Sequence, residues 1–215
     1  MVGILLNPGG SAAGPVVNLP APSLKGRVSV EEALQARRTV RRFAHRALSL
    51  TQLSQLLWAA DGVTDPRRGY RSAPSAGALY PLDLYVAVGE RSVADLPPGV
   101  YHYLPDRQGL ELITKGDIRK ELARAALYQS WMAEAPIMVV ITAEYARCTQ
   151  KYGQRGLLYT HIEVGHVGQN LFLQAEALSL GAGIVGAFEN QAVSQIMGLP
   201  PAQEPLLIMP IGYKH

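Results

Sequence analysis

The sequence predicts an α+β fold, and three observations lead to that prediction. The chain has 215 residues, of which 48% are hydrophobic and 17% charged, so it is able to bury a substantial core. Its expected strands are separated by irregular distances and do not alternate with helices as in a βαβ series. Two of them, 100–104 and 110–113, flank the turn-forming run Pro105-Asp106-Arg107-Gln108-Gly109 and predict a β-hairpin.

Capping boxes predict where the first two helices begin. Ser29 is followed three residues later by Glu32, and Ser49 by Gln52. The second helix carries leucines at helical spacing on one face, and Gly62 is its expected end.

The later elements are predicted from apolar runs and from helix stop signals. A short helix is expected to be capped by Asn190 and ended by Gly198. The longest helix is expected over 156–180, closed by Gly181. The remaining expected elements are the strands 84–88, 137–142 and 206–211 and the helix 118–128.

Residues 1–28 differ from the rest of the chain because they contain many glycines and prolines and show no helical or strand period. They predict an extended N-terminal arm with little core of its own, which in an oligomer could wrap a partner. Residues 29–215 are expected to form a single domain.

Composition limits the possible functions. The net charge of +3 does not favour nucleic-acid binding, and Cys148 is the only cysteine, so neither an intramolecular disulfide nor a cysteine-pair zinc site is expected. The N-terminal apolar run Val2–Leu6 is too short for a signal peptide or a membrane span. We expect a cytoplasmic protein without a metal site.

The run 35–46 concentrates basic charge. It holds five arginines in ten positions, Arg37, Arg38, Arg41, Arg42 and Arg46, with Thr39 among them. Guanidinium groups and a hydroxyl suit a phosphate monoester, because charge-assisted hydrogen bonds to it are strong and directional. A solvated basic surface is the main alternative, and an RNA-binding patch is less favoured because only Phe43 accompanies the arginines.

Two segments rich in small residues could approach a flat ligand closely. The first is 71–81, where Ser75, Ala76 and Gly77 lie in a loop that lacks a Walker lysine and GxGxxG spacing. The second is 181–188, which has three glycines around a short apolar run. Taken alone, the first segment is better explained as a tight loop that leads into a strand, whereas the second suggests a backbone pressed against a planar surface.

Two features belong to the long helix. Lys151 and Tyr152 precede it and could supply a charge and a proton, or could simply be a solvated helix entrance. Gly165 and Gly168 lie inside it, where glycine costs about 1 kcal/mol relative to alanine, so another helix is expected to pack closely on that face.

Taken in order, the segments Arg-Arg-Thr-Val-Arg, APSAGALYP, KYGQRG, GHVGQN and GAF resemble the nitroreductase superfamily of flavoproteins, and most closely its SagB-type branch of azoline dehydrogenases. The resemblance runs from about Ser29 to Gly212. It implies a mostly antiparallel central sheet flanked by helices and a homodimer built around the long central helix, with FMN bound between the subunits.

The resemblance also implies a role for each matching residue. Arg37, Arg38 and Thr39 would hold the FMN phosphate and ribityl chain, and Arg41 would lie beside the N1–O2 edge of the ring. Pro74, Ser75, Ala76 and Gly77 would line the flavin across the dimer interface. Val185 and Gly186 would present their backbone to N5 and O4, while Lys151 and Tyr152 match an acid/base pair of the azoline dehydrogenases. Lys214 is a further basic residue that could help to hold the phosphate.

Several functions are compatible with this resemblance. The leading expectation is reduction of a small nitroaromatic or quinone-like electrophile with NAD(P)H. Ala78 stands where many nitroreductases have asparagine, which argues against ordinary nitro-substrate behaviour. The alternatives are oxidation of peptide azolines to azoles, a flavin-degrading or dehalogenating enzyme, and a non-catalytic flavin-binding subunit.

Overall fold

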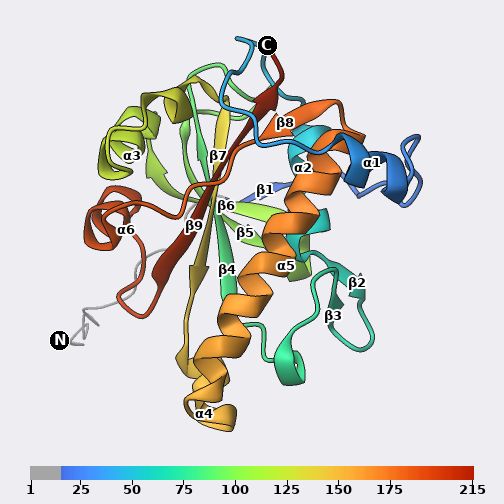
Figure 1. The fold of residues 1–215 in the computed structure, drawn as a ribbon, viewed down its shortest axis with the longest axis vertical. Coiled ribbons are helices and arrows are strands. Elements are labelled where there is room, and N and C mark those ends of the chain that lie inside the picture. The colour runs from blue at the N-terminus through green and yellow to red at the C-terminus, as the bar shows by residue number, and fades with distance from the viewer. Residues whose placement is uncertain (1–15) are drawn as a thin grey trace, which may run out of the picture.

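The structure, a computed structural model, describes residues 16–215. In this part of the chain a seven-stranded sheet occupies the centre, with the strand order β1-β6-β5-β4-β7-β9-β8 (Figure 1). All its neighbouring strands are antiparallel. The predicted α+β fold with a mostly antiparallel sheet is therefore confirmed. The strands are β1 (Val16–Asn18), β4 (Leu82–Val88), β5 (Gly99–Leu104), β6 (Gly109–Lys115), β7 (Ile137–Ala143), β8 (Leu180–Ala182) and β9 (Glu204–Tyr213).

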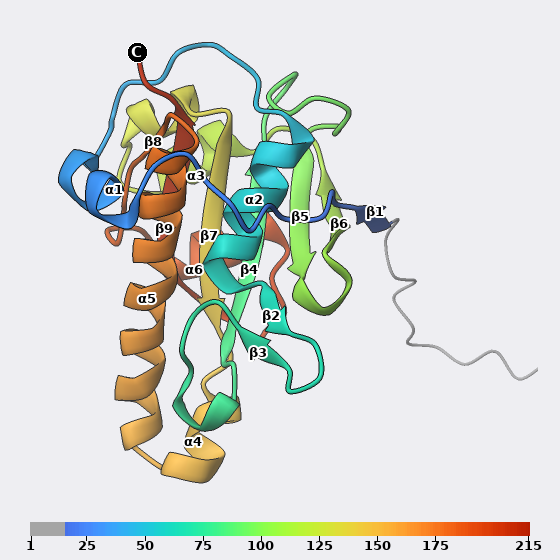
Figure 2. The same cartoon turned by 90° about the vertical axis from the view of Figure 1, so that its right-hand side faces the viewer.

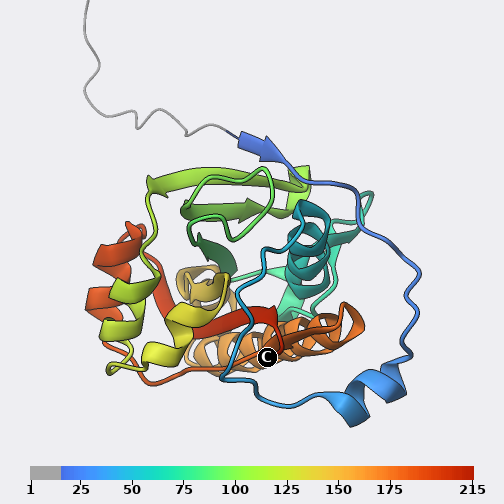
Figure 3. The ribbon, with the colours of Figure 1, turned by 90° about the horizontal axis from the view of Figure 1, so that it is seen from above.

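Helices cover both faces of the sheet, α2 and α5 on one side and α3 and α6 on the other (Figure 3). A separate small ribbon pairs β2 (Val63–Asp65) with β3 (Tyr70–Arg71). The helices are α1 (Val30–Ala36), α2 (Leu50–Asp61), α3 (Arg119–Ala125), α4 (Ala146–Tyr152), α5 (Arg155–Ala177) and α6 (Asn190–Met197). Three short 3₁₀ turns are η1 (Ala76–Ala78), η2 (Pro105–Arg107) and η3 (Ser130–Glu134).

The two faces of the sheet form two cores because side chains alternate along each strand. In β4, Leu84 and Val86 pack with α2 and α5, whereas Tyr85 and Ala87 pack with α3 and α6. In β7, Val139 pairs with Val86 of β4 and packs in the same core, with α2 and α5. Its neighbours Met138 and Val140 pack in the other core, with α3 and α6.

Local sequence signals account for several boundaries. The side chains of Ser29 and Ser49 each accept a hydrogen bond from the backbone of the residue three positions on, and Glu32 and Gln52 return the interaction, so both predicted capping boxes are present. Gly62 caps α2, and the predicted hairpin forms from β5 and β6.

Within the expected arm, β1 pairs with β6 and Leu19 beside it is buried; residues 1–15 of the arm lie outside the described part. Three predictions about helix ends were wrong. The long helix ends at Ala177, where Ser179 takes the left-handed conformation (φ 58°), and Gly181 belongs to β8. A Cβ at Gly181 would lie 2.7 Å from the side chain of Val40, so that glycine serves a close approach of two segments.

The other two differences concern the ends of short helices. Asn190 is the first residue of α6, and its side-chain amide donates a hydrogen bond to Glu204 (2.8 Å) and does not cap the helix. The helix α3 ends at Ala125, three residues short of the expected end, because Leu127 and Tyr128 adopt positive φ angles of 55° and 59°.

Candidate functional site

The arginine run follows α1 and lies along the edge of the sheet at β8. Thr39 bridges to Ala182, and the Val40 amide donates a hydrogen bond to the Ala182 carbonyl (2.9 Å). Phe43 then bridges to Lys214 beyond β9. The backbone of the run is therefore fixed by the sheet, while four of its five arginines are exposed: Arg38, Arg41, Arg42 and Arg46.

These arginines have no carboxylate partner in residues 16–215, since no ion pair involves any of the five. Arg37 lies 5.1 Å over the ring of Phe172 and Arg41 lies 5.7 Å over Trp131. Arg38 is exposed, and its Nη1 donates hydrogen bonds to the carbonyls of Gln35 (2.9 Å) and Arg37 (2.7 Å). An unpaired group of guanidinium cations is a suitable site for an anion.

Arg46 also lies over an aromatic ring, with its guanidinium carbon 3.9 Å from the ring centroid of Tyr213, a shorter distance than for Arg37 or Arg41. Lys214 is also engaged, with its Nζ paired to a carboxylate oxygen of Glu176 at 2.6 Å. Lys214 is therefore not a free cation that could help the arginines.

The turn after β8 lies beside the same arginines. Val185 is buried and bridges to Ile208, whereas Gly186 is exposed, with open space where a Cβ would stand. A Cβ at Gly183 would lie 2.7 Å from the ring of Trp131, the residue that Arg41 covers. The structure thus brings Arg41, Trp131 and the Val185–Gly186 turn together, and we call this group with Arg37, Arg38 and Thr39 the arginine half-site.

The second group of predicted residues meets elsewhere. Gly77, in the left-handed conformation (φ 63°), is so close to α4 that a Cβ there would lie 2.6 Å from the Tyr152 hydroxyl and 3.0 Å from Lys151 Nζ. Tyr152 is half-buried and packs edge-on against Tyr159 (5.2 Å between ring centroids). We call the loop Pro74–Gly77 with Lys151 and Tyr152 the loop half-site. The two residues are the last of α4, a helix that was not predicted, and not the entrance of α5.

The two half-sites lie along α5 at different heights. Tyr152 packs near Tyr159, whereas Arg37 packs on Phe172, and between those two helix positions α5 rises by about 20 Å. One chain therefore does not gather all the predicted residues at one place. Figures 1 and 2 show α5 running the height of the molecule, with α4 at one of its ends and α1 near the other.

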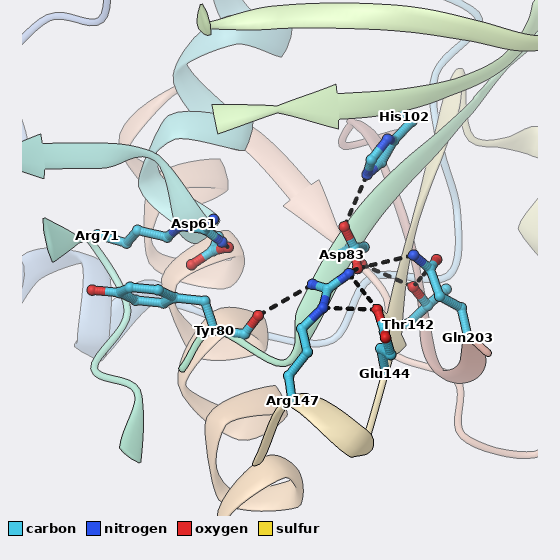
Figure 4. A network of polar contacts seen from close by, with 9 residues as sticks. All are labelled: Asp61, Arg71, Tyr80, Asp83, His102, Thr142, Glu144, Arg147 and Gln203. Carbon is cyan, nitrogen blue, oxygen red and sulfur yellow. Dashed lines mark hydrogen bonds and ion pairs between the residues drawn. The ribbon is translucent and has the colours of Figure 1, made fainter. Parts of the chain in front are cut away.

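A polar network holds Tyr80, three residues after the loop Pro74–Gly77 (Figure 4). Arg147 donates a hydrogen bond to the Tyr80 carbonyl (3.2 Å) and pairs with Asp83 (2.8 Å) and Glu144 (2.7 Å). Asp83 also contacts His102 Nε2 (3.0 Å). Burial alone would raise the pKa of Asp83, but the hydrogen bond from His102 and the charge of Arg147 hold it below its usual range.

The backbone directly after Pro74–Gly77 is strained. Ala78 and Tyr80 adopt positive φ angles of 53° and 45°, which non-glycine residues rarely do. Such strain persists only where the surrounding structure imposes it, and it gathers at binding sites. Here Tyr80 is held by Arg147 on one side and by Arg71, which stacks 4.4 Å over its ring, on the other.

Two buried carboxyl groups beside this loop were missed by the sequence reasoning. Asp61 is at the end of α2 and pairs with Arg71 (2.6 Å), and Glu163 is on α5. Burial raises the pKa of each to about 7. The helical period could have revealed Glu163, since it lies four residues before Val167, on the buried face of α5. Trp131 in the arginine half-site carried no comparable signal.

Comparison with known proteins identifies relatives of this chain. The profile described as the nitroreductase family matches residues 34–213. The chain is 43% identical over 201 residues to the candidate nitroreductase MJ1384 of Methanocaldococcus jannaschii, which covers 94% of this chain and 98% of that protein. It is 27% identical over 161 residues to the microcin B17-processing protein McbC of Escherichia coli, covering 71% of this chain and 57% of McbC.

Solved structures show the same fold. The crystal structure of a candidate nitroreductase from Ralstonia eutropha matches with a TM-score of 0.82 and 30% identity, over 99% of this chain and 96% of that one. The Escherichia coli microcin synthetase McbBCD complex matches with a TM-score of 0.72 and 23% identity, over 99% of this chain and 78% of that one. This chain spans a little over half the length of McbC, so McbC's activity and partners are not transferred with the fold.

Proposed function

Because the chain belongs to the nitroreductase family, we propose that it is an FMN-dependent oxidoreductase that works as a homodimer. The observation that carries the proposal is the arginine half-site. Its arginines lack carboxylate partners in residues 16–215 and lie beside a turn where Gly186 leaves open space. The guanidinium groups can form charge-assisted hydrogen bonds with a phosphate. The glycine backbone without a Cβ allows a planar ring to approach closely.

The residues of the arginine half-site fit this cofactor. Arg37, Arg38 and Thr39 would bind the phosphate and ribityl chain, and Arg41 would place a positive charge near the ring. The backbone of Val185 and Gly186 would face the ring edge. When bound, FMN supplies hydride transfer at its N5 position, while the protein supplies orientation and charge.

A second copy of the chain would complete the site. The loop half-site lies about 20 Å along α5 from Arg37, so a partner packed antiparallel on α5 would bring its own Pro74–Gly77 toward this chain's arginines. The free face of α5 suits such a contact. Leu158 and Ile162 are exposed (45% and 47%) and line up with Gly165, where a Cβ would meet no atom within 4 Å.

We propose that the substrate is a small nitroaromatic or quinone-like electrophile and that NAD(P)H supplies the electrons. The similarity to MJ1384 over nearly all of both chains supports this assignment. No helix in residues 16–215 is long and apolar enough to cross a membrane. We also propose a cytoplasmic location, in keeping with a single, buried cysteine.

Purification of the chain without added flavin tests the proposal. FMN is expected to accompany the protein and to be released on denaturation, and NADH or NADPH is expected to be consumed when a quinone is present. A protein that fails to bind FMN at micromolar concentration contradicts the assignment. FMN binding without turnover of any quinone or nitroaromatic would favour a non-catalytic flavin-binding subunit.

One observation favours a second candidate function, oxidation of peptide azolines. Lys151 and Tyr152 meet Gly77 in the loop half-site, where an acid/base pair would be needed to remove a carbon-bound proton. The 27% identity to McbC supports the same reading. Incubation with an azoline-containing peptide, followed by mass spectrometry for the loss of two hydrogens, distinguishes this activity from that of a reductase.

A further inference from the structure

Glu163 is a buried acid whose two carboxyl oxygens have no hydrogen-bond partner among residues 16–215. The residue is only 2% exposed. An ionised carboxylate is costly to bury unless it is paired and hydrogen-bonded. A glutamate at this position therefore has a reason other than stability.

Four other elements present polar groups to Glu163. Burial raises the pKa of Glu163 to about 7, the Ser75 hydroxyl lowers it, Asp61 on α2 raises it and Arg71 on β3 lowers it. From α4 the thiol of Cys148 faces the same carboxyl group, and burial together with the charge of Glu163 raises the pKa of that thiol. Arg71 already pairs with Asp61, so Glu163 has no cation of its own.

The same stretch of α5 also contacts the loop at a second point. His166 lies one turn after Glu163, and its Nδ1 is 3.4 Å from the Pro74 carbonyl oxygen. Within the loop, the Ser75 hydroxyl oxygen accepts a hydrogen bond from the Tyr80 amide (3.0 Å). Pro74 thus lies against His166 of α5, the hydroxyl of Ser75 is near the Glu163 carboxyl group, and Gly77 packs against α4.

We propose that Glu163 is a positioning residue that, in its neutral form, holds the loop Pro74–Gly77 against α5. A neutral carboxyl group can remain in this dry contact with Ser75. Once ionised, it would place a buried negative charge beside the Asp61 carboxyl group without a cation of its own, because Arg71 pairs with Asp61, and the loop would have to lift to admit water. The inference rests on the proposed function only in that the loop is taken to line the flavin.

The direction of the pH effect follows from the raised pKa. Because the folded protein binds the Glu163 proton more tightly than the unfolded chain does, the docked loop is most stable at low pH. Ionisation opposes docking increasingly as the pH rises from 4.5, the ordinary value for glutamate, to about 7. Above pH 7 the opposition is complete.

Hydrogen exchange in the full chain, stripped of flavin, tests this inference without depending on catalysis. The readout is the protection factor of the Tyr80 amide between pH 5.5 and 8.5, corrected for the intrinsic exchange rate. Protection is expected to fall by up to about tenfold per pH unit as the pH rises toward about 7, the limit for a single proton, and to level off above that pH. Glu163→Gln should abolish this dependence, and Glu111→Gln, a carboxyl change on β6, should retain it. A pH-independent wild type, or loss of the dependence in both variants, would overturn the inference.

A second variant keeps the test decisive if Glu163→Gln does not fold. Asp61→Asn removes the neighbouring negative charge and frees Arg71 to face Glu163, so the pH midpoint of loop protection should move downward. An unchanged midpoint contradicts the proposal. Titration with FMN then tests the proposed function separately from the role of Glu163. A chain whose loop protection depends on pH but which never binds FMN would refute the proposed function and leave the role of Glu163 intact.

Discussion

Arg38 and Arg46 belong to the same basic run, yet their side chains have different surroundings. Arg38 is exposed and donates hydrogen bonds to the backbone carbonyls of Gln35 and Arg37, whereas Arg46 is stacked on Tyr213. Arg38→Ala is therefore expected to weaken FMN binding far more than Arg46→Ala. Loss of a charged bond to a phosphate costs roughly 1.5–3 kcal/mol, about tenfold to a hundredfold in affinity, which fluorescence quenching of FMN measures. Equal effects at both positions would mean that the run is a diffuse basic surface.

Tyr152 separates the two candidate reactions. Tyr152→Phe is expected to leave quinone or nitroaromatic reduction nearly unchanged, because a reductase needs no base to remove a carbon-bound proton. If the chain oxidises azolines, the same variant should lower turnover by about 10²–10⁴-fold with FMN still bound. Steady-state rates with both substrates, beside the flavin absorbance of each preparation, provide the measurement. Loss of flavin in the variant would show that Tyr152 is structural, since it packs on Tyr159 and Gly77.

At this scale the sequence identified side chains but not their neighbours. The arginines and Gly77 could be identified as site residues from residue type and resemblance. Trp131 and Glu163 could be identified only from the contacts that they make in the folded structure. Trp131 is brought to Arg41 by the turn between α3 and β7, and no periodicity predicts that contact. Lys214 is close to the run, but its pairing with Glu176 depends on where α5 ends.

Among the elements, α1 and α2 begin with the same kind of capping box but differ in what they bury. The helix α2 buries Leu53, Leu56 and Leu57, whereas α1 buries only Ala33. Ser49→Ala should lower the free energy of unfolding by about 1 kcal/mol, because the cap belongs to a helix that unfolds with the core. Ser29→Ala should change it much less, because α1 can fray separately. Urea denaturation of both variants checks this, and a larger loss for Ser29→Ala would contradict it.

The elements that the sequence predicted best are those with a local signal. Capping serines, the hairpin turn and Gly198 at the end of α6 act within a few residues, so they could be recognised directly. The ribbon of β2 and β3 and the helix α4 are also local but were not predicted, whereas the strand β1 depends on a partner distant in the sequence. Val16–Asn18 becomes a strand because the edge of β6 offers unpaired backbone groups, which its own glycine- and proline-rich context does not suggest.

For the whole molecule, the expected homodimer depends on which face of α5 is free. Both helix glycines were expected to face the partner, but Gly168 is buried against Leu207 and Met209 of β9 (3.4 and 3.7 Å from a Cβ). That part of the prediction was wrong, because the helix approaches its own sheet at this point. Gly165 faces away, in line with the exposed Leu158 and Ile162.

Gly165→Leu therefore tests the dimer. A leucine there meets no atom of its own chain, so the folded protomer should keep its helical content, whereas a closely packed partner helix would be overfilled. The variant is expected to sediment as a monomer and to lose FMN, because the loop half-site of a partner would no longer reach the arginines. Gln195→Leu, at an exposed position of α6 on the opposite side of the sheet, is the control for added apolar surface. If Gly165→Leu remains a flavin-loaded dimer, the partner does not pack on this face. If the wild-type protein binds FMN fully as a monomer, the site is not shared between subunits.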